Sequence, residues 1–143
     1  MNELEKQIKQ VFDAYKAAVF AKDVNAFVAL YDDNVHIFDM WEKWSHDGIK
    51  AWRGMATEWL GSLGDERVVV EFDDLQITGN QDFAIAYAFV TYKAISVDGK
   101  ELRSLNNRIT LNLKNTKGVW KIIHEHTSAP VDGSTQKVNL HRE

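Results

Sequence analysis

Two residues in the first third of the chain, Tyr15 and Asp39, have side chains suited to proton transfer. Tyr15 lies on the apolar stripe of a periodic segment, and Asp39 follows the short β-prone segment Val35–Phe38. A carboxylate in an apolar cleft resists ionisation, and a buried phenol can donate to a developing enolate oxygen. In one cleft they could move a proton next to a carbonyl group. The structural alternative is that Tyr15 only packs in the core and Asp39 caps a turn.

The segment Met40–Trp44 places two tryptophans in a polar loop, where exposing such large rings is costly. Trp41 and Trp44, together with Trp52 and Trp59 further on, can form an aromatic cage for a flat apolar ligand. The alternative is packing in the core or in a dimer. Core packing is favoured for Trp52 and Trp59, whereas the two interpretations are equally weighted for Trp41 and Trp44.

Near the C-terminus, His124, Glu125 and His126 follow one another on a β-prone segment. Strand alternation puts both histidines on one face, together with Ile122, and puts Glu125 on the other face. A His-x-His pair on one strand face can bind a metal when a third ligand converges on it. The third ligand would have to be a residue such as His36 or Asp39, and nothing in the sequence fixes its convergence, so we predict no metal site and no cofactor.

Polar side chains also alternate along the preceding predicted strand, where Arg108, Thr110 and Asn112 alternate with Ile109, Leu111 and Leu113. Polar groups on an interior sheet face need partners. They either line a wet pocket or meet a second subunit, and the pocket is favoured for Asn106 and Arg108. The chain has neither a phosphate-binding glycine loop nor a nucleophile-elbow pattern.

Composition restricts the class of protein. The 143 residues fit one domain, residues 1–143, with a polar tail from about residue 131. The net charge of −4 and the scattered basic residues argue against nucleic-acid partners and against a basic membrane patch. No apolar run is long enough to span a membrane. The absence of cysteine excludes disulfides and thiolate catalysis, and fits a cytoplasmic protein.

Periodicity predicts that helices come first and strands follow. A first helix is expected over residues 2–21, a short second helix after the N-cap Asp23, and a third with an inner stripe around Trp52. Alternating segments then predict long antiparallel strands. Their parity changes at Asp73–Asp74, which indicates a bulge, and Asp98–Gly99 indicates a hairpin turn. The expected fold is α+β: a cone-shaped, curved antiparallel sheet wrapped around three N-terminal helices, with an internal pocket.

Two stretches carry a resemblance to a known superfamily: AYKAAVFAKDVNAFVALYDDNVHIFD in the helical half and GVWKIIHEHTSAP at the end of the sheet. Across roughly residues 4–131 the chain resembles the SnoaL-like, nuclear-transport-factor-2-like superfamily, which includes ketosteroid isomerase. The C-terminal stretch is also similar to the association domain of calcium/calmodulin-dependent protein kinase II. The resemblance implies a cone fold with a pocket, in proteins that range from isomerases to oligomerisation modules.

The resemblance also implies roles for individual residues. Tyr15 falls on the catalytic tyrosine of ketosteroid isomerase, and Asp39 falls on its general base. Glu125 is expected to point into the cone and to pair with Arg108, in a structural or substrate-orienting role. Ketosteroid isomerase has a protonated aspartic acid on its penultimate strand, whereas this chain reads SLNNRIT there, with no acid.

Two functions follow from the sequence. The first is binding of a small apolar molecule with cofactor-independent acid–base chemistry, such as isomerisation, dehydration or cyclisation of a carbonyl compound. Asp39 would be the base and Tyr15 the donor, and the substrate would contact Trp41, Trp44, Trp52, Asn106, Arg108 and Glu125. The alternative is a non-catalytic ligand-binding or oligomerisation module. In both cases a homodimer through the sheet face is expected, because an uncovered apolar sheet face needs cover.

Overall fold

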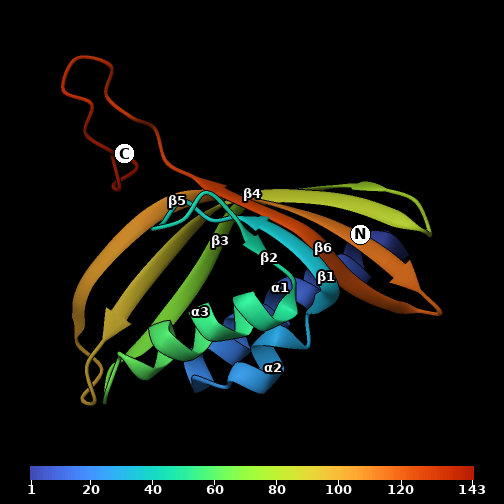
Figure 1. Cartoon of the computed structure of the whole chain (residues 1–143), viewed down its shortest axis with the longest axis horizontal. Coiled ribbons are helices and arrows are strands. Elements are labelled where there is room, and N and C mark those ends of the chain that lie inside the picture. Colours follow the sequence, from blue (N-terminus) through green and yellow to red (C-terminus); the bar gives the residue numbers. More distant parts are fainter.

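Three helices pack into the hollow of one curved six-stranded sheet, as the computed structural model of residues 1–143 shows (Figure 1). Two of them begin the chain, and two strands precede the third. The elements in chain order are α1 Glu3–Ala21, α2 Val24–Val28, β1 Tyr31–Phe38, β2 His46–Asp47, α3 Ile49–Gly61, β3 Arg67–Gly79, β4 Phe83–Ile95, β5 Glu101–Thr116 and β6 Val119–Ser128. The predicted α+β cone is therefore confirmed. None of the helices combines the length and hydropathy that a membrane span requires.

The strand order across the sheet is β2-β1-β6-β5-β4-β3. β3, β4, β5 and β6 form an antiparallel meander, and β1 pairs in parallel with β6. The sheet is thus mixed, not wholly antiparallel as expected. A parallel pair needs a long crossover connection, and here the chain between β1 and β6 supplies it with α3 and four further strands.

Local capping explains where the first two helices begin and end. The Asn2 side chain accepts a hydrogen bond from the Glu5 N–H at 2.8 Å and begins α1. Lys22 ends α1 in the left-handed conformation, with φ at 55° and its N–H on the Val19 carbonyl. Asp23 then accepts from the Ala26 N–H at 3.0 Å and begins α2, as predicted.

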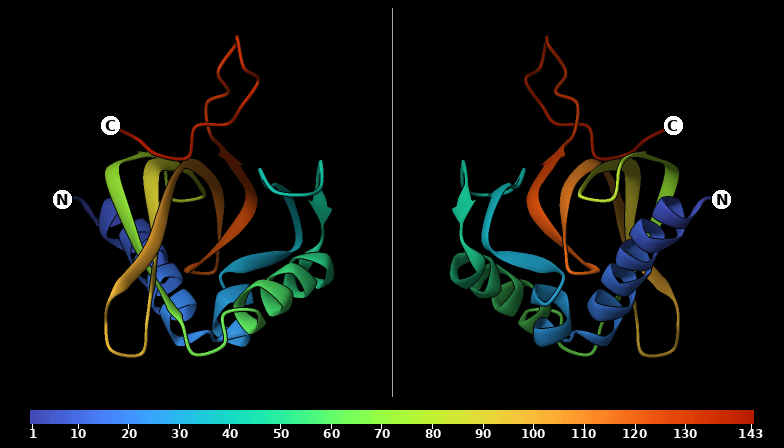
Figure 2. Two further views of the ribbon diagram at one scale, coloured as in Figure 1. Left: turned by 90° about the vertical axis from the view of Figure 1, so that its left-hand side faces the viewer. Right: turned by 90° about the vertical axis from the view of Figure 1, so that its right-hand side faces the viewer.

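The sheet curls because its strands are long and bulged. β3, β4 and β5 have 13, 13 and 16 residues, against about 5–6 in an ordinary strand. The register between β3 and β4 shifts between Asp73 and Gln76, and Asp74 has a φ of 54°. This is the bulge that the parity change predicted, and a bulge increases local bend and twist. The side views show the strands arching around the helices (Figure 2).

A second register shift changes which side chains of β6 face inward. Asn112 pairs with His124 but Leu113 pairs with Ile122, so Ile123 is the extra residue. As a result, Ile122 and Glu125 are both buried on the inner face. Simple alternation had placed Ile122 with the histidines, and the bulge corrects that expectation.

The C-terminal tail returns to the outer face of the sheet. After β6 it makes a small loop closed by a bridge between Val131 and Val138, which projects from the sheet in Figure 1. The Asn106 N–H then donates to the Leu140 carbonyl at 2.7 Å, and the Arg142 guanidinium lies 3.7 Å from the centre of the Phe89 ring. The tail of one chain therefore covers part of its own outer face.

One apolar core of 25 buried residues joins the helices to the inner face of the sheet, so truncating an inner residue should cost far more than truncating an exposed one. Leu111 on β5 is 1% exposed, whereas Leu102 on the same strand is 48% exposed. We expect Leu111→Ala to lower the free energy of unfolding by about 2–5 kcal/mol and Leu102→Ala to change it by less than about 0.5 kcal/mol. Urea unfolding measures both, and equal losses would contradict this assignment of faces.

Candidate functional site

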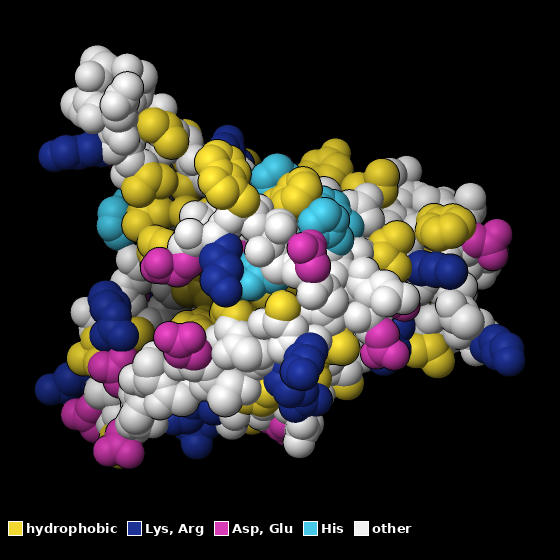
Figure 3. All heavy atoms as spheres, in the orientation of Figure 1, with side chains coloured by type: hydrophobic (Ala, Val, Ile, Leu, Met, Phe, Trp, Pro, Cys, Tyr) yellow, Lys and Arg dark blue, Asp and Glu magenta, His cyan; other side chains and the backbone are white.

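A cavity of about 1020 Å³ lies between α3, the end of β1 and the inner face of the sheet, and we call it the inner cavity. Figure 3 shows apolar side chains inside a hollow whose rim carries charged groups. Its polar lining includes Tyr15, Asp39, His46, Tyr92, Asn107, Glu125 and Thr127. Its apolar lining includes Phe27, Trp41, Trp52, Met55, Trp59, Leu63, Val68 and Leu105. Tyr15 and Asp39, which are far apart on the chain, are therefore brought to the same cavity.

Tyr15 is hydrogen-bonded to a second tyrosine that the sequence analysis did not single out. The hydroxyl oxygens of Tyr15 on α1 and Tyr92 on β4 are 2.9 Å apart. Burial raises the pKa of Tyr15 and of Tyr92, so both phenols are neutral at physiological pH. In such a pair one hydroxyl donates to the other, which leaves one O–H free to donate to a bound molecule. We call these residues the tyrosine pair.

Asp39 lies just beyond the end of β1 and is held by a residue near the end of strand β6. The Thr127 hydroxyl donates to Asp39 Oδ1 at 3.0 Å and in turn accepts from the Met40 N–H at 2.8 Å. Burial raises the pKa of Asp39, and the hydrogen bond from Thr127 opposes that rise. Asp39 is therefore a weakly hydrated, oriented carboxyl group, as a general base requires.

Glu125 is the second acid of the inner cavity and is only 2% exposed. The Tyr31 hydroxyl donates to Glu125 Oε1 at 2.6 Å. Burial raises the pKa of Glu125 to about 8; the Tyr31 hydrogen bond lowers it and the nearby Asp39 charge raises it. Glu125 thus holds a proton at neutral pH and can donate it. We call Asp39 and Glu125 the carboxyl pair.

The expected partner of Glu125, Arg108, lies on the opposite face of the sheet. Its Nε donates to Ser128 Oγ at 3.0 Å. Asn106 also faces outward and donates from Nδ2 to Thr91 Oγ1 at 2.8 Å. The predicted placement of Asn106 and Arg108 in the pocket is corrected, because Asn107 is the buried residue that lines the cavity. A shift of one residue exchanges the two faces of a strand.

The four tryptophans of the predicted cage divide between the cavity and the surface. Trp52 is buried, and Trp59 also lines the cavity. Trp41 lines the mouth and is 41% exposed. Trp44 is 97% exposed and does not line the cavity, so it is not part of the expected cage. The aromatic wall is completed by Phe27 from α2, whose ring lies 6.2 Å from that of Trp52.

Several cavity residues escaped sequence analysis. Tyr92 lies in a segment that is apolar on both faces, so nothing set it apart from its neighbours. Asn107 was missed because the alternation along β5 placed it on the outer face. Thr127 shares strand parity with Glu125, and that alternation was the one usable signal.

Three buried polar atoms have no hydrogen-bond partner: His46 Nε2, Trp52 Nε1 and Asn107 Oδ1. All three residues line the inner cavity.

The histidines of β6 lie outside the cavity. His126 is exposed on the outer face, and His124 Nδ1 lies 2.5 Å from the His36 carbonyl oxygen. Their rings surround that of Phe38, at 5.0 Å for His124 and 5.5 Å for His126. No group of three or more His, Asp or Glu side chains is arranged to hold a metal ion.

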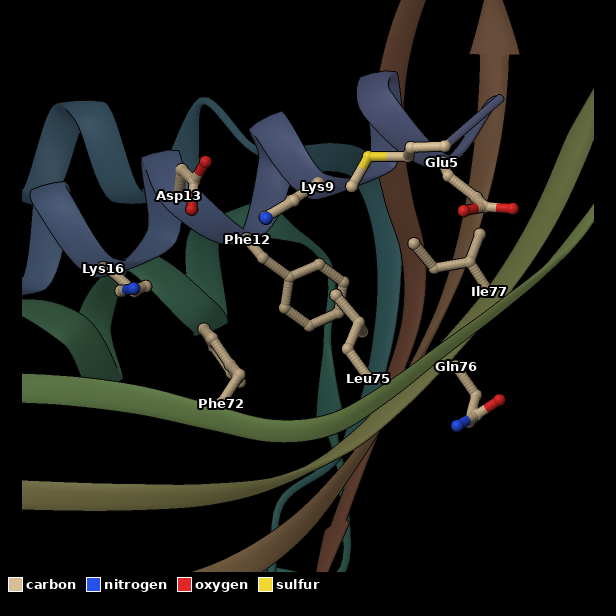
Figure 4. Close-up of a pocket in the computed structure, with 10 residues that line it drawn as sticks. Glu5, Lys9, Phe12, Asp13, Lys16, Phe72, Leu75, Gln76 and Ile77 are labelled. Carbon is tan, nitrogen blue, oxygen red and sulfur yellow. The ribbon is translucent and has the colours of Figure 1, made fainter. Parts of the chain in front are cut away.

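A second, smaller hollow of about 450 Å³ lies between α1 and β3 (Figure 4). Phe12, Leu75 and Ile77 line its apolar part, and charged side chains of α1 such as Lys9 and Asp13 lie along it. It contains no buried acid or unpartnered polar group. The chemistry of the molecule is therefore concentrated in the inner cavity.

Sequence and structure comparisons agree with this geometry. The profile of the SnoaL-like domain matches residues 8–132. The chain belongs to this family. Among curated proteins, none matches it by sequence.

Solved structures place this SnoaL-like domain in the nuclear-transport-factor-2-like superfamily. An NTF2-like protein of unknown function from Pseudomonas putida KT2440 has 27% identity and a TM-score of 0.85, with 97% of this chain and 95% of that chain covered. ActVI-ORFA from Streptomyces coelicolor has 9% identity and a TM-score of 0.78, with 89% and 97% covered. A putative calcium/calmodulin-dependent protein kinase II association domain from Xanthomonas campestris has 17% identity and a TM-score of 0.71, with 90% and 89% covered. At such identities the last two show the fold alone.

The buried acid makes stability depend on pH. An unfolded glutamate ionises near 4.5, whereas Glu125 ionises near 8, so the folded state binds more protons between these values. The free energy of unfolding should therefore fall as pH rises through this interval, by up to about 1.4 kcal/mol per pH unit from this group. Glu125→Gln removes the titration and should flatten the profile.

Urea unfolding from about pH 5 to about pH 9 measures the difference between the two proteins. Asp39 titrates in both of them, so its contribution cancels in the comparison. Parallel profiles for the wild type and Glu125→Gln would show that Glu125 ionises normally.

Proposed function

We propose that this SnoaL-like protein binds a small apolar molecule in the inner cavity and catalyses cofactor-independent acid–base chemistry on it. The reaction class is isomerisation, dehydration or cyclisation of a carbonyl compound. One observation carries the proposal: the tyrosine pair and the carboxyl pair line a single, largely apolar cavity. Apolar walls with a few convergent polar groups and acids of raised pKa are typical of a catalytic pocket.

In this mechanism Asp39 removes a proton from the carbon next to the carbonyl group. The electrons of the C–H bond move to the carbonyl oxygen and form an enolate, and Asp39 becomes a carboxylic acid. The free O–H of the tyrosine pair donates to the enolate oxygen. Asp39 then returns the proton to another atom of the substrate, so no external acid, base or oxidant is needed. Thr127 positions Asp39 through the 3.0 Å hydrogen bond.

Glu125 supplies the second donor to the enolate. The strand segment SLNNRIT lacks the acid found there in ketosteroid isomerase, but a protonated Glu125 on the neighbouring strand can donate in the same way. Its raised pKa, to about 8, supports this role at neutral pH. A carboxylic acid is a stronger donor than the amide of Asn107, which lines the same cavity.

The alternative proposal is a non-catalytic module that assembles through its outer sheet face. Exposed apolar side chains support it: on β4, Phe83 is 53%, Ile85 43% and Tyr87 48% exposed. The neighbour from Xanthomonas campestris, whose name refers to an association domain, is consistent with it. The same surface supports a homodimer in the catalytic proposal, beside the part that the C-terminal tail already covers.

Proton abstraction can be tested before the substrate is known. Incubated in D₂O with a panel of cyclic enones and aryl ketones, the protein should speed deuterium incorporation next to the carbonyl of a compound it accepts. Asp39→Asn should slow this exchange by about 10²–10⁴-fold, because a general base contributes that much. Proton NMR measures the rates.

The matched control is Asp33→Asn, which changes an exposed aspartate on β1. It should exchange at the wild-type rate. A folded Asp39→Asn protein, verified by circular dichroism, that exchanges as fast as the wild type would refute the base assignment.

Assembly is a separate expectation. Ile85→Glu places a charge in the exposed apolar part of β4 and should convert a dimer to a monomer, since burying an unpaired charge is costly. Val97→Glu, in a turn residue that is 81% exposed, is the control and should leave the dimer intact. Sedimentation velocity at micromolar concentration reports both, and a monomeric wild type would remove the assembly proposal.

A further inference from the structure

Neither member of the carboxyl pair forms an ion pair with a basic side chain. Glu125 accepts from Tyr31, and Asp39 accepts from Thr127, so both are held by neutral hydroxyls. Three basic side chains line the cavity. Lys43 and Arg103 are exposed, whereas His46 is buried and opposes the rise that burial causes in the pKa of Asp39. Arg103 is already paired with Glu66 at 2.7 Å. Buried carboxyl groups are normally paired with a cation or kept neutral, and Glu125 is kept neutral because the protein supplies it with no cation.

A buried acceptor in the same cavity lacks a donor. Asn107 is 6% exposed, lines the cavity and leaves its Oδ1 without a hydrogen-bond partner. A ketone brings only an acceptor, which can accept from the unpartnered Trp52 Nε1–H but cannot satisfy Asn107 Oδ1. A primary ammonium group brings three donors and a positive charge. It can therefore donate hydrogen bonds to Asn107 Oδ1 and to both members of the carboxyl pair.

The walls of the cavity are also suited to a cation with an apolar body. Trp41, Trp52 and Trp59 line it together with Tyr92. The rings of Trp59 and Tyr92 lie 6.1 Å apart at 79° and so present differently oriented surfaces. Aromatic faces attract cations, and tryptophan does so most strongly. The same rings provide apolar surface for the rest of the ligand.

We propose that the inner cavity takes an apolar amine in its protonated form, with the ammonium group directed to Asp39, Glu125 and Asn107 and the apolar body held among the tryptophan rings. This inference rests on the proposed function only in taking the inner cavity as the ligand site. It holds whether or not the bound molecule is turned over.

Binding of an ammonium group should release protons. With the cavity free of ligand, Glu125 holds a proton at neutral pH. A neighbouring cation favours the ionised carboxylate and lowers the pKa. Up to one proton per bound amine should therefore leave Glu125, whereas a neutral ligand should release none.

The test compares four ligands with the same phenyl-alkyl body: 4-phenylbutylamine, 4-phenylbutan-1-ol, 4-phenylbutan-2-one and 4-phenylbutanoate. Isothermal titration calorimetry at neutral pH, in two buffers of different ionisation enthalpy, measures affinity and proton release together. We expect the amine to bind at least about tenfold more tightly than the alcohol, a difference of about 1.4 kcal/mol. The carboxylate should bind most weakly, and proton release should accompany the amine alone.

Variants connect the preference to the carboxyl pair. Glu125→Gln should weaken amine binding by about tenfold or more and abolish proton release, while the affinity for the alcohol changes less than about twofold. Glu101→Gln, which changes an exposed glutamate at the start of β5, is the control and should bind all four ligands as the wild type does.

The outcomes separate this inference from the proposed chemistry. Equal affinity for the amine and the alcohol would overturn the cation inference. Tightest binding of the ketone would also overturn it, but would leave the proposed function standing. If no ligand of the series binds, the inference also falls. Tight amine binding without deuterium exchange into any carbonyl compound would support the inference and refute the acid–base function.

Discussion

The hydrogen bond from Tyr31 to Glu125 is the interaction around which the interior of this protein is organised. It joins the first strand to the last, across the one parallel pairing of the sheet, and gives a buried acid its only protein donor. A neutral hydroxyl offsets part of the cost of burial without supplying charge. Burial keeps the proton on Glu125 at neutral pH, although the Tyr31 hydrogen bond opposes this. Burial also raises the pKa of Tyr15 and of Tyr31, and Glu125 raises both further once it is ionised.

The cavity itself follows from a mismatch between the sheet and the helices. Long bulged strands curl into a hollow that three helices only partly fill, because α2 has 5 residues and α3 has 13. α1 closes one side by packing Phe12 against Phe72 of β3, with ring centres 4.8 Å apart. The space left beyond Phe27 is where the tyrosine pair and the carboxyl pair meet. The scaffold therefore creates the pocket, and a few side chains decide its chemistry.

The two faces of the sheet carry different kinds of side chains. The inner face carries the buried polar groups, whereas the outer face carries exposed apolar residues of β4, the histidines of β6 and the returning tail. Because neighbouring residues of a strand point to opposite faces, a single bulge decides which face each later residue occupies. The bulge at Ile123 puts Glu125 on the inner face of the sheet, and the bulge at Asp74 exchanges the two faces along β3.

Most of the fold could be predicted from the sequence. Helical periodicity, the Asp23 cap, the parity change at Asp73–Asp74 and the family motifs are local signals, and each is expressed in the structure. Tyr15, Asp39, Trp41, Trp52 and Glu125, which the sequence singled out, all line the inner cavity, and their roles there stay predictions.

Tertiary structure decided what local signals cannot encode. Asn106 and Arg108 were assigned to the wrong face, because strand parity depends on where bulges form between paired strands. Tyr31 and Glu125 are 94 residues apart, and Tyr15 and Tyr92 are 77 apart. Such partners are selected by the pairing of β1 with β6 and the packing of α1 on the sheet, so their pKa values and their chemistry exist only in the folded chain.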